Sequence, residues 1–556
     1  MSHHLQPHGW PRCEKPIDSR VEAIRLGQTA LVILAILASA CAPQAAPPTS
    51  PDLILRGGWV LDGTGNPWYQ ADVAVKGDRI LAVGRLNGIE ATTEVDVQGL
   101  FLTPGFIDVH SHAAQGLSTQ GLSPAPSLLA QGITTVVLNP DDGGDAWDLQ
   151  VQREALLEHG LGLNVAQYIG HGAVRSAVLG MSDRAPNQDE LQEMRLLTRA
   201  AMELGAVGLS SGLFSAPGAF ADTDELVALA RVVAEYDGIY ASHIRDEADY
   251  TVGLLVAVEE VITVASEAGI PGIVTHVKAL GPRVWGLSDT IVARVEEARA
   301  RGVELWADQY PYAASATSLV AALIPQWALE GGRDALLERL GSTDGRARIV
   351  GEMEENLERR GGAARIQFRR FEVDPSIEGR TLAEVAEQQG ITDLEAALYL
   401  VERGNPQIVS FNMSETDLRT FMRQPWVMTS SDGDLVPFGE GVPHPRTYGA
   451  FPRKLQSYVL EERVVTLENA IRSMTSLPAM VMRLPDRGVI RAGAFADLAV
   501  LDLDRIRDAA RYEDPHQLAE GVVHLYVNGL PAIQDGVPTE GLHGRVLDRA
   551  GPEGGR

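Results

Sequence analysis

Four histidines and one aspartate each follow a short apolar run that is typical of a β-strand. His110 and His112 end the run PGFIDVHSH, and His243 follows IYAS. His276 follows IVT, and Asp432 follows VMTSS. Because side chains on a strand alternate between its two faces, His110 and His112 point the same way and can offer imidazoles to one ion. An isolated His-x-His pair is more often two ordinary histidines, but five such groups placed alike indicate a metal site that suits zinc.

The middle of the chain alternates short apolar runs with longer helical segments, which is typical of a parallel α/β barrel. A TIM (β/α)8 barrel brings the carboxyl ends of all its strands to one mouth, where the five groups would meet. The eighth strand comes late, so we expect an insertion at about 321–423 between the seventh and eighth strands. The eight candidate strands are 106–109, 134–138, 164–169, 207–210, 239–242, 272–275, 303–307 and 426–429.

Both ends of the chain body have a β-rich texture that differs from the barrel. Short runs of β-branched residues separated by Gly, Asp and Asn lie within 53–104, and similar runs within 486–547 include the hairpin signal Asn528-Gly529. We therefore expect one small β-sandwich domain, built as an antiparallel sheet from both ends of the mature chain. The metal-dependent barrel would span 105–485.

The first forty residues have the layout of a signal peptide. Basic residues precede the apolar run 30–37, which is too short to span a bilayer, and Ala38-Ser39-Ala40 leads into Cys41. This end resembles a bacterial lipoprotein signal in which Cys41 receives the lipid, although Ala38 stands where Leu is usual. We expect a signal at 1–40, a tether at 41–52 and an exported protein anchored in the periplasm or at the cell surface; the alternative is a short buried N-terminal helix.

Composition narrows the classes of partner. The chain has 556 residues, 45% of them apolar, and a net charge of −27, which argues against binding a nucleic acid through its phosphates. The two cysteines are Cys13 and Cys41, so cleavage before Cys41 leaves one thiol and no disulfide. We expect the only membrane contact to be the lipid anchor at Cys41.

Several motifs in order resemble the amidohydrolase superfamily and, within it, the D-aminoacylase (N-acyl-D-amino-acid deacylase) family. The resemblance runs from about Leu53 to about Leu547 and implies hydrolysis of the amide bond of a small N-acyl-D-amino acid, with one or two zinc ions as cofactor. The matching motifs are PGFIDVHSH at 104–112, QGITTVV at 131–137, SHIRDE at 242–247, HVK at 276–278, DQYPY at 308–312, SDG at 431–433, HPRTYG at 444–449 and GAFADL at 493–498.

The resemblance also implies which residues bind the metal. His110 and His112 would hold the more exposed position, and His243 and His276 the second. The bridging ligand of the family is a Cys six residues after the second Thr of the GITT motif, and that position is Asp141 here. A carboxylate can also ligate zinc, so Asp141, or Asp142 if the loop shifts by one residue, could replace the thiolate. The alternative is that Pro140 to Gly144 form only a turn.

The same resemblance implies a hydrolytic mechanism with a clamp for the substrate carboxylate. Asp432 would be both a metal ligand and the catalytic base that passes a proton to the leaving amine. Lys278, Tyr310 and Arg446 would bind the carboxylate of the amino acid, for which a guanidinium offers a bidentate fork.

Two other functions remain open from the sequence. Hydantoinases and dihydroorotases of the same superfamily bridge two metal ions through a carboxylated Lys, but Ser210-Ser211-Gly212-Leu213 stands near the end of the fourth strand. A lipoprotein that binds small molecules without catalysis is the other alternative, and the complete set of histidines and Asp432 argues against it.

Overall fold

The computed structural model of the protein describes residues 50–143 and 147–549. The expected signal peptide and Cys41 lie outside the described residues. Among the described residues, no helix combines the length and the apolar character needed to cross a membrane.

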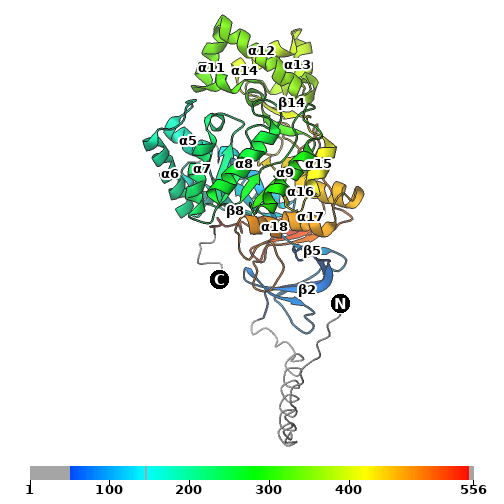
Figure 1. The fold of residues 1–556 in the computed structure, drawn as a ribbon. Helices are drawn as coiled ribbons and strands as arrows, with labels where there is room; N and C mark the ends of the chain where they lie inside the picture. Colours follow the sequence, from blue (N-terminus) through cyan, green and yellow to red (C-terminus); the bar gives the residue numbers. More distant parts are fainter. Residues whose placement is uncertain (1–49, 144–146, 550–556) are drawn as a thin grey trace, which may run out of the picture. The chain divides into compact units, whose positions relative to one another are not determined.

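Eight parallel strands form the closed sheet that the sequence predicted (Figure 1). The short strand β17 follows β16 after three residues and pairs in parallel with β6, which closes the ring. Each expected strand overlaps an observed one. The strands are β6 (Phe106–His112), β7 (Ile133–Leu138), β8 (Asn164–Gly170), β9 (Gly208–Gly212), β10 (Ile239–His243), β11 (Gly272–Val274), β12 (Leu305–Gln309), β16 (Val427–Thr429) and β17 (Gly433–Asp434).

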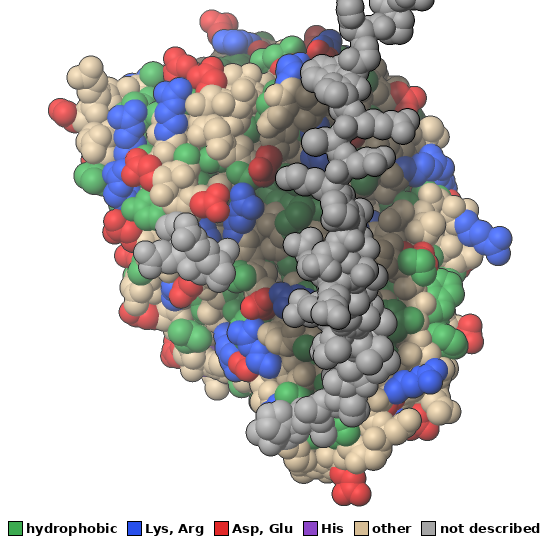
Figure 2. Space-filling model, turned by 60° about the horizontal axis from the view of Figure 1, so that its bottom comes forward, with side chains coloured by type: hydrophobic (Ala, Val, Ile, Leu, Met, Phe, Trp, Pro, Cys, Tyr) green, Lys and Arg blue, Asp and Glu red, His purple; other side chains and the backbone are tan. Residues whose placement is uncertain are grey.

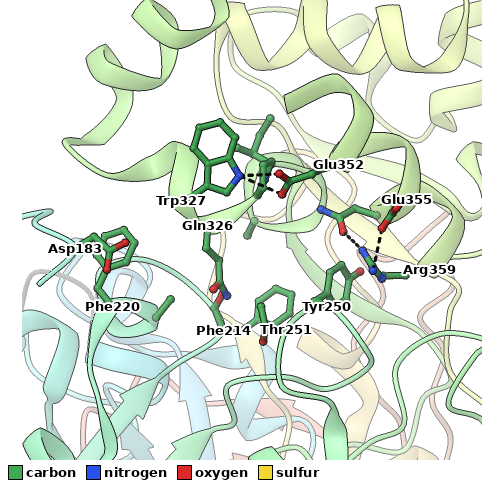
Figure 3. A pocket seen from close by; sticks show the side chains of 15 residues that line it. Asp183, Phe214, Phe220, Tyr250, Thr251, Gln326, Trp327, Glu352, Glu355 and Arg359 are labelled. Atoms are coloured by element: carbon green, nitrogen blue, oxygen red, sulfur yellow. Dashed lines mark hydrogen bonds and ion pairs between the residues drawn. The ribbon is translucent and has the colours of Figure 1, made fainter. Parts of the chain in front are cut away.

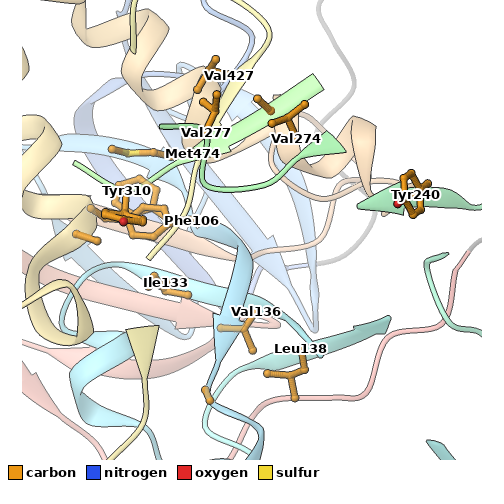
Figure 4. Close-up of a cluster of buried hydrophobic side chains, with 14 of the residues drawn as sticks. Phe106, Ile133, Val136, Leu138, Tyr240, Val274, Val277, Tyr310, Val427 and Met474 are labelled. Carbon is orange, nitrogen blue, oxygen red and sulfur yellow. The ribbon is translucent and has the colours of Figure 1, made fainter. Parts of the chain in front are cut away.

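Alternation along these strands gives the barrel two hydrophobic layers. One buried cluster takes side chains from six of the strands, including Ile107, Tyr168 and Met428, and from Val207 just before β9, and Trp306 of β12 packs against it, so its members meet inside the ring. Helix α18 (Ser476–Val481) contributes Leu477 to this inner cluster. The residues between them on the strands face the surrounding helices and form a second, larger cluster, part of which Figure 4 shows.

Amphipathic helices occupy the crossovers between the parallel strands and cover the outside of the barrel. In α7, for example, the apolar residues Leu226, Leu229 and Val233 are buried, while Asp222 caps the first turn by accepting from the Glu225 N–H at 2.8 Å. The covering helices include α4 (Leu149–Glu158), α5 (His171–Leu179), α6 (Gln188–Glu203), α7 (Thr223–Ala234), α8 (Leu254–Ala268), α9 (Ser288–Ala300), α15 (Glu415–Met422) and α17 (Leu467–Met474).

The segment between β12 and β16 forms a separate layer with its own core. Its three strands make an antiparallel sheet in the order β13-β15-β14, and its helices pack around a distinct apolar cluster. In Figure 1 these helices lie beyond one end of the barrel. The sheet of this layer begins before residue 321, the expected start of the insertion. Helix α15 packs on barrel helix α9, so α15 belongs to the barrel although it lies within the expected insertion. The elements are β13 (Ser315–Ser318), α10 (Leu319–Leu323), α11 (Gly332–Gly341), α12 (Thr343–Arg359), β14 (Ile366–Arg370), α13 (Leu382–Gln389), α14 (Asp393–Arg403) and β15 (Gln407–Ser410).

Strands from both ends of the chain combine in a second nine-stranded sheet. The expectation of a purely antiparallel sheet was wrong in part, because β1 pairs in parallel with β4 and β5. The hairpin β2–β3 uses one edge of β1, and the chain then returns along its other edge in the same direction. The strands are β1 (Leu53–Val60), β2 (Tyr69–Lys76), β3 (Arg79–Gly84), β4 (Thr93–Asp96), β5 (Phe101–Pro104), β18 (Leu498–Leu501), β19 (Val522–Val527), β20 (Leu530–Gln534) and β21 (Val537–Pro538).

A buried polar network joins this sheet to the amino ends of the barrel strands. Asn164 is the first residue of β8, and its side chain exchanges hydrogen bonds with Asp497 and Asn528. Arg487 forms an ion pair with Asp497 and donates to Asn528 Oδ1 at 3.1 Å. The junction is therefore at the opposite end of the barrel from the strand ends that carry the histidines.

Charged side chains of both signs cover the face that Figure 2 presents. On the part not drawn in grey, Lys and Arg side chains are interspersed with Asp and Glu, and apolar side chains lie singly between them. On this face the acidic side chains do not collect in one patch.

Candidate metal centre

Asp141 lies at the centre of the four histidines that the sequence singled out. Its Oδ2 is 3.2 Å from His110 Nε2 and 3.6 Å from His112 Nε2, both on β6. The same oxygen is 3.4 Å from His243 Nδ1 at the end of β10 and 3.3 Å from His276 Nε2 just after β11. Two groups of donors therefore share Asp141, one with the β6 histidines and Asp432, the other with His243 and His276.

Three of these residues have left-handed backbones. Asp141 has φ of 50°, His276 of 35° and Asp432 of 50°, in a region that costs free energy for residues other than glycine. Each follows the end of a barrel strand, where this conformation breaks the strand alternation and turns the side chain into the mouth. The surrounding fold therefore has to hold strained residues in place at the site.

The spacing of the donors fits zinc. Ligands at about 2.0–2.1 Å from a tetrahedral zinc ion lie about 3.3–3.4 Å from one another. In the first group, His110 and His112 lie 3.6 and 3.2 Å from Asp432 Oδ1; in the second, His243 Nδ1 and His276 Nε2 are 3.1 Å apart. Asp141 Oδ1 is buried without a hydrogen-bond partner among the described residues, which fits a carboxylate that would bind metal.

Asp432, the predicted base, is held by the predicted carboxylate clamp. Arg446 donates to both of its oxygens, at 2.7 and 2.9 Å, and both side chains are buried. Burial alone would raise the pKa of Asp432, but the Arg446 guanidinium and the nearby imidazoles hold it well below its usual range. Arg446 is thus paired within the protein before any substrate carboxylate arrives.

Glu247, which sequence reasoning did not single out, orients the second group of donors. Its Oε1 is 3.1 Å from His276 Nδ1, and this contact directs the other ring nitrogen, Nε2, toward Asp141. Lys278 Nζ donates to the same Glu247 oxygen at 2.5 Å and lies 2.6 Å from His276 Nδ1. The sequence did contain a signal that could have identified Glu247, because it lies four residues after His243 within the SHIRDE motif.

Tyr310 brings the three predicted substrate-binding residues together. Its ring centroid is 4.7 Å from the Arg446 guanidinium carbon and 5.8 Å from Lys278 Nζ, so two cations flank one aromatic ring. All three line a cavity of about 420 Å³ that also contains the donor cluster. The cavity mouth is lined from the insertion by Ser315, Ala316, Thr317, Ser318, Ala321, Arg360, Arg369, Asn405 and Gln407.

The insertion adds two arginines that the sequence gave no reason to place at the site. Arg369 forms an ion pair with Asp434 at 2.5 Å. Arg360 is fully buried, and in the described part of the chain its hydrogen bonds go to the Ala322 carbonyl and the Ser410 hydroxyl, not to a carboxylate. Both lie in charge-rich segments that are typical of a solvated helical layer, so their position depends entirely on the tertiary fold.

A second hollow of about 460 Å³ lies beside the metal cavity, between the barrel and the insertion (Figure 3). Phe214 borders both spaces; its ring stacks on His243 at 5.6 Å and meets Tyr250 edge-on at 5.4 Å. Across the hollow, the Trp327 indole donates to Glu352 at 3.0 and 3.1 Å. Phe214 therefore separates the metal-binding cluster from a half-apolar space.

Asp142, the alternative ligand, is directed away from the histidine cluster. It accepts hydrogen bonds from the Gly172 and Gly212 backbone N–H groups, at 3.0 and 2.5 Å. Strand β9 contains no Lys, and its Ser211 hydroxyl is bonded to Tyr240, so the end of this strand offers no group for carboxylation. The structure therefore brings Asp141 to the centre of the cluster and leaves Asp142 outside it.

Comparisons with known proteins agree with this architecture. The model of the amidohydrolase family matches residues 93–533. Two proteins of Alcaligenes xylosoxydans xylosoxydans, an N-acyl-D-glutamate deacylase and a D-aminoacylase, are each 33% identical to 90% of this chain, which covers 96% and 98% of their lengths. One solved structure that is similar is an N-acyl-D-glutamate deacylase from Bordetella bronchiseptica, complexed with zinc and a phosphonate mimic of the tetrahedral intermediate. Its TM-score is 0.76 and its sequence is 34% identical, and the match covers 90% of this chain and all of that one.

The chain belongs to the amidohydrolase family. Within that family it resembles the deacylases that act on N-acyl-D-amino acids along nearly its whole length. The resemblance seen in the motifs, and the TIM-barrel fold that it implied, are confirmed.

Proposed function

We propose that this protein is a zinc-dependent hydrolase that cleaves the linear amide bond of N-acyl-D-amino acids, releasing a carboxylate and a free D-amino acid. The observation that carries the proposal is the convergence of two imidazole pairs on Asp141, next to Asp432. This site occurs in a chain that is similar over 90% of its length to an N-acyl-D-glutamate deacylase and a D-aminoacylase.

The residues at the barrel mouth divide the work. His110, His112, His243 and His276 would hold zinc with Asp141 between the two positions. Bound zinc acidifies water and polarises the scissile carbonyl. Asp432 then takes the proton of the attacking water and gives it to the departing amine nitrogen, for which its place beside both β6 histidines is suitable.

The cations around Tyr310 would bind the product half of the substrate. An amino acid carries a carboxylate next to the scissile nitrogen, and Arg446 and Lys278 both line the cavity near the base. Because each is already paired with an acidic side chain, the substrate carboxylate has to share these cations with Asp432 and Glu247. Arg360 adds positive charge to the same cavity.

The test is amide hydrolysis by the zinc-loaded protein on matched substrates. N-acetyl-D-amino acids, their L-enantiomers, a hydantoin and dihydroorotate are compared by amine release or ring opening. We expect turnover of the D-acyl compounds and its loss in Asp432→Asn. Turnover confined to the cyclic amides would contradict the proposal and favour a cyclic amidase, and zinc binding with no turnover of any substrate would favour a binding protein.

We also propose that the protein is exported and anchored by a lipid on Cys41. The supporting observation is the order of basic residues, a short apolar run and Ala38-Ser39-Ala40-Cys41. Expression of the full chain with a radiolabelled fatty acid should label the wild type and not Cys41→Ser, and fractionation should place the wild type with membranes. An unlabelled wild type in the cytosol would contradict this proposal without affecting the enzymatic one.

A further inference from the structure

Asp142 is a carboxylate with a side chain only 13% exposed, and the proposed chemistry does not use it. It follows the central ligand Asp141 directly, and its φ of 77° makes it the second consecutive left-handed residue of the loop. Its Oδ1 accepts from the Gly172 N–H in the first turn of α5 and from the Gly212 N–H at the end of β9. A carboxylate at this end of a helix is stabilised by the unpaired N–H groups and the helix dipole.

Three glycines from separate segments enclose the Asp142 carboxylate. A Cβ atom added at Gly172 or Gly218 would lie 2.4 or 2.5 Å from it, and one at Gly212 would lie 3.0 Å away. Since real Cβ atoms do not approach so closely, none of these positions could carry a side chain without displacing the carboxylate. The space around Asp142 is therefore shaped to the group that occupies it.

A chain of alternating charges extends from Asp142 into the barrel wall. His171 Nδ1 is 3.6 Å from Asp142 Oδ1, and its Nε2 is 2.7 Å from Glu225. Arg175 pairs with the other Glu225 oxygen and donates to the Arg184 carbonyl at 2.7 Å. His171, Arg175 and Glu225 are fully buried. If His171 is protonated, its charge and that of Arg175 balance the negative charges of Asp142 and Glu225.

From these contacts we infer that Asp142 is a positioning residue for the metal site: anchored by the Gly172 and Gly212 N–H groups and facing His171, it holds Asp141 in the left-handed conformation that reaches both histidine pairs. Asp141 and Asp142 are joined by one planar peptide group, so an anchor on Asp142 restricts the backbone orientation of Asp141. The Asp142 anchor supplies the free energy that keeps the strained Asp141 backbone in place. This inference rests on the proposed zinc chemistry, but it concerns a residue pair that the chemistry itself leaves unexplained.

Zinc affinity is the readout that separates positioning from simple stabilisation of the fold. Affinity is measured in chelator-buffered zinc for the full-length protein, and thermal unfolding is measured on the metal-stripped protein. Asp142→Asn keeps the acceptor for the glycine N–H groups and removes the charge that faces His171. His171→Gln removes the imidazole, and Gly172→Ala displaces the Asp142 carboxylate without changing any charge.

Two matched variants control for general damage. Gly351→Ala adds the same methyl group where a Cβ meets nothing within 4 Å, and Asp497→Asn breaks a buried ion pair at the far end of the barrel. We call Asp142→Asn, His171→Gln and Gly172→Ala the loop variants, because all three act on the Asp142 loop. We expect them to bind zinc at least about tenfold more weakly than the wild type. Both controls should bind zinc as the wild type does, whatever their unfolding temperature.

The outcomes divide cleanly. Loop variants that lose thermal stability but keep wild-type zinc affinity would overturn the inference and make Asp142 a fold residue only. Equal zinc losses in the loop variants and in Asp497→Asn would overturn it as well. A wild type that binds zinc without cleaving N-acyl-D-amino acids would refute the proposed function and still allow the positioning test, whereas a wild type that binds no zinc would refute both.

Discussion

Two clusters of buried charge lie at opposite ends of the barrel and differ in how completely their polar atoms are paired. At the junction with the β domain, the polar groups of Asn164, Arg487, Asp497 and Asn528 bond to one another or to backbone. At the mouth, by contrast, His110 Nδ1, Asp141 Oδ1 and His243 Nε2 are buried without hydrogen-bond partners among the described residues.

The difference indicates what each cluster is for. A buried polar group without a partner costs free energy, so a stable fold keeps such groups only where something else uses them. The junction cluster satisfies itself and contributes to folding. The mouth cluster is completed from outside, by metal ions and substrate, and we expect mutations in the two clusters to separate activity from stability.

The largest expected effect is at the mouth. Asp432→Asn preserves the shape of the side chain but removes the proton acceptor, so kcat should fall about a thousandfold. The change also leaves Arg446 buried without its ion-pair partner, so the unfolding free energy should fall as well, and kcat is measured on folded protein. Stopped assays of amine release and urea unfolding of the same preparation check both expectations. An unchanged kcat would show that another group moves the proton.

The matching change at the junction should lower stability without lowering kcat. Asp497→Asn leaves Arg487 buried without its ion-pair partner, so the unfolding free energy should drop by about 3 kcal/mol. The kcat of the folded enzyme should stay as it is. Urea unfolding combined with assays well below the transition tests the contrast, which a parallel loss of kcat in folded protein would break.

The order of the barrel strands and the site residues at their carboxyl ends could be predicted from the sequence for one physical reason. Short β-branched runs mark strands, and a strand that belongs to a barrel brings the residues at or just after its carboxyl end to the mouth. His243 ends β10, and His276 and Asp432 follow β11 and β16 within three residues. Asp141 was located by the family resemblance, six residues after Thr135, and β7 ends three residues before it.

What the sequence could not supply depends on backbone turns and long-range packing. The left-handed φ values at 141 and 142 decide which of two adjacent aspartates faces the histidines, and no spacing rule encodes them. Arg360 reaches the cavity only because the insertion folds over the mouth. The parallel pairing of β1 with β5 likewise reflects a path through space, which strand-like texture alone does not reveal.

A smaller effect should sharpen the role of Arg446 at the mouth. Arg446→Lys keeps the charge but loses the bidentate fork, so KM for N-acyl-D-amino acids should rise about tenfold. The amides of the same substrates, which lack the carboxylate, serve as the control and should show no comparable rise in KM. If kcat falls equally for both substrate sets, Arg446 acts by holding Asp432 instead.

The last effect appears only as pH changes and concerns a buried Lys whose hydrogen bonds go to two hydroxyls. Lys454 donates to Thr429 and Ser473 at 2.8 and 2.9 Å, and burial lowers its pKa to about 7. An unfolded Lys keeps its proton to about pH 10.4, so between the two pKa values the unfolded state binds more protons and stability rises with pH.

This rise should be at most about 1.4 kcal/mol per pH unit between pH 7 and 10. Lys454→Met should lack that component, so the difference in unfolding free energy between wild type and variant should change steadily across this range. Urea unfolding at several pH values measures it. A difference that is constant with pH would show that Lys454 remains protonated in the folded protein.

The shared β domain also sets the order in which the protein can be made. Strand β5 lies between β1, from the same end of the chain, and β18, from the other end, so its second edge stays open until the last part of the chain has left the ribosome. During synthesis the barrel segments therefore appear before the sheet that joins the two termini can close. The β domain therefore stays incomplete until the C-terminal strands have been made. A truncation that removes β18–β21 would leave β5 as an unpaired edge strand able to pair with another copy of the chain.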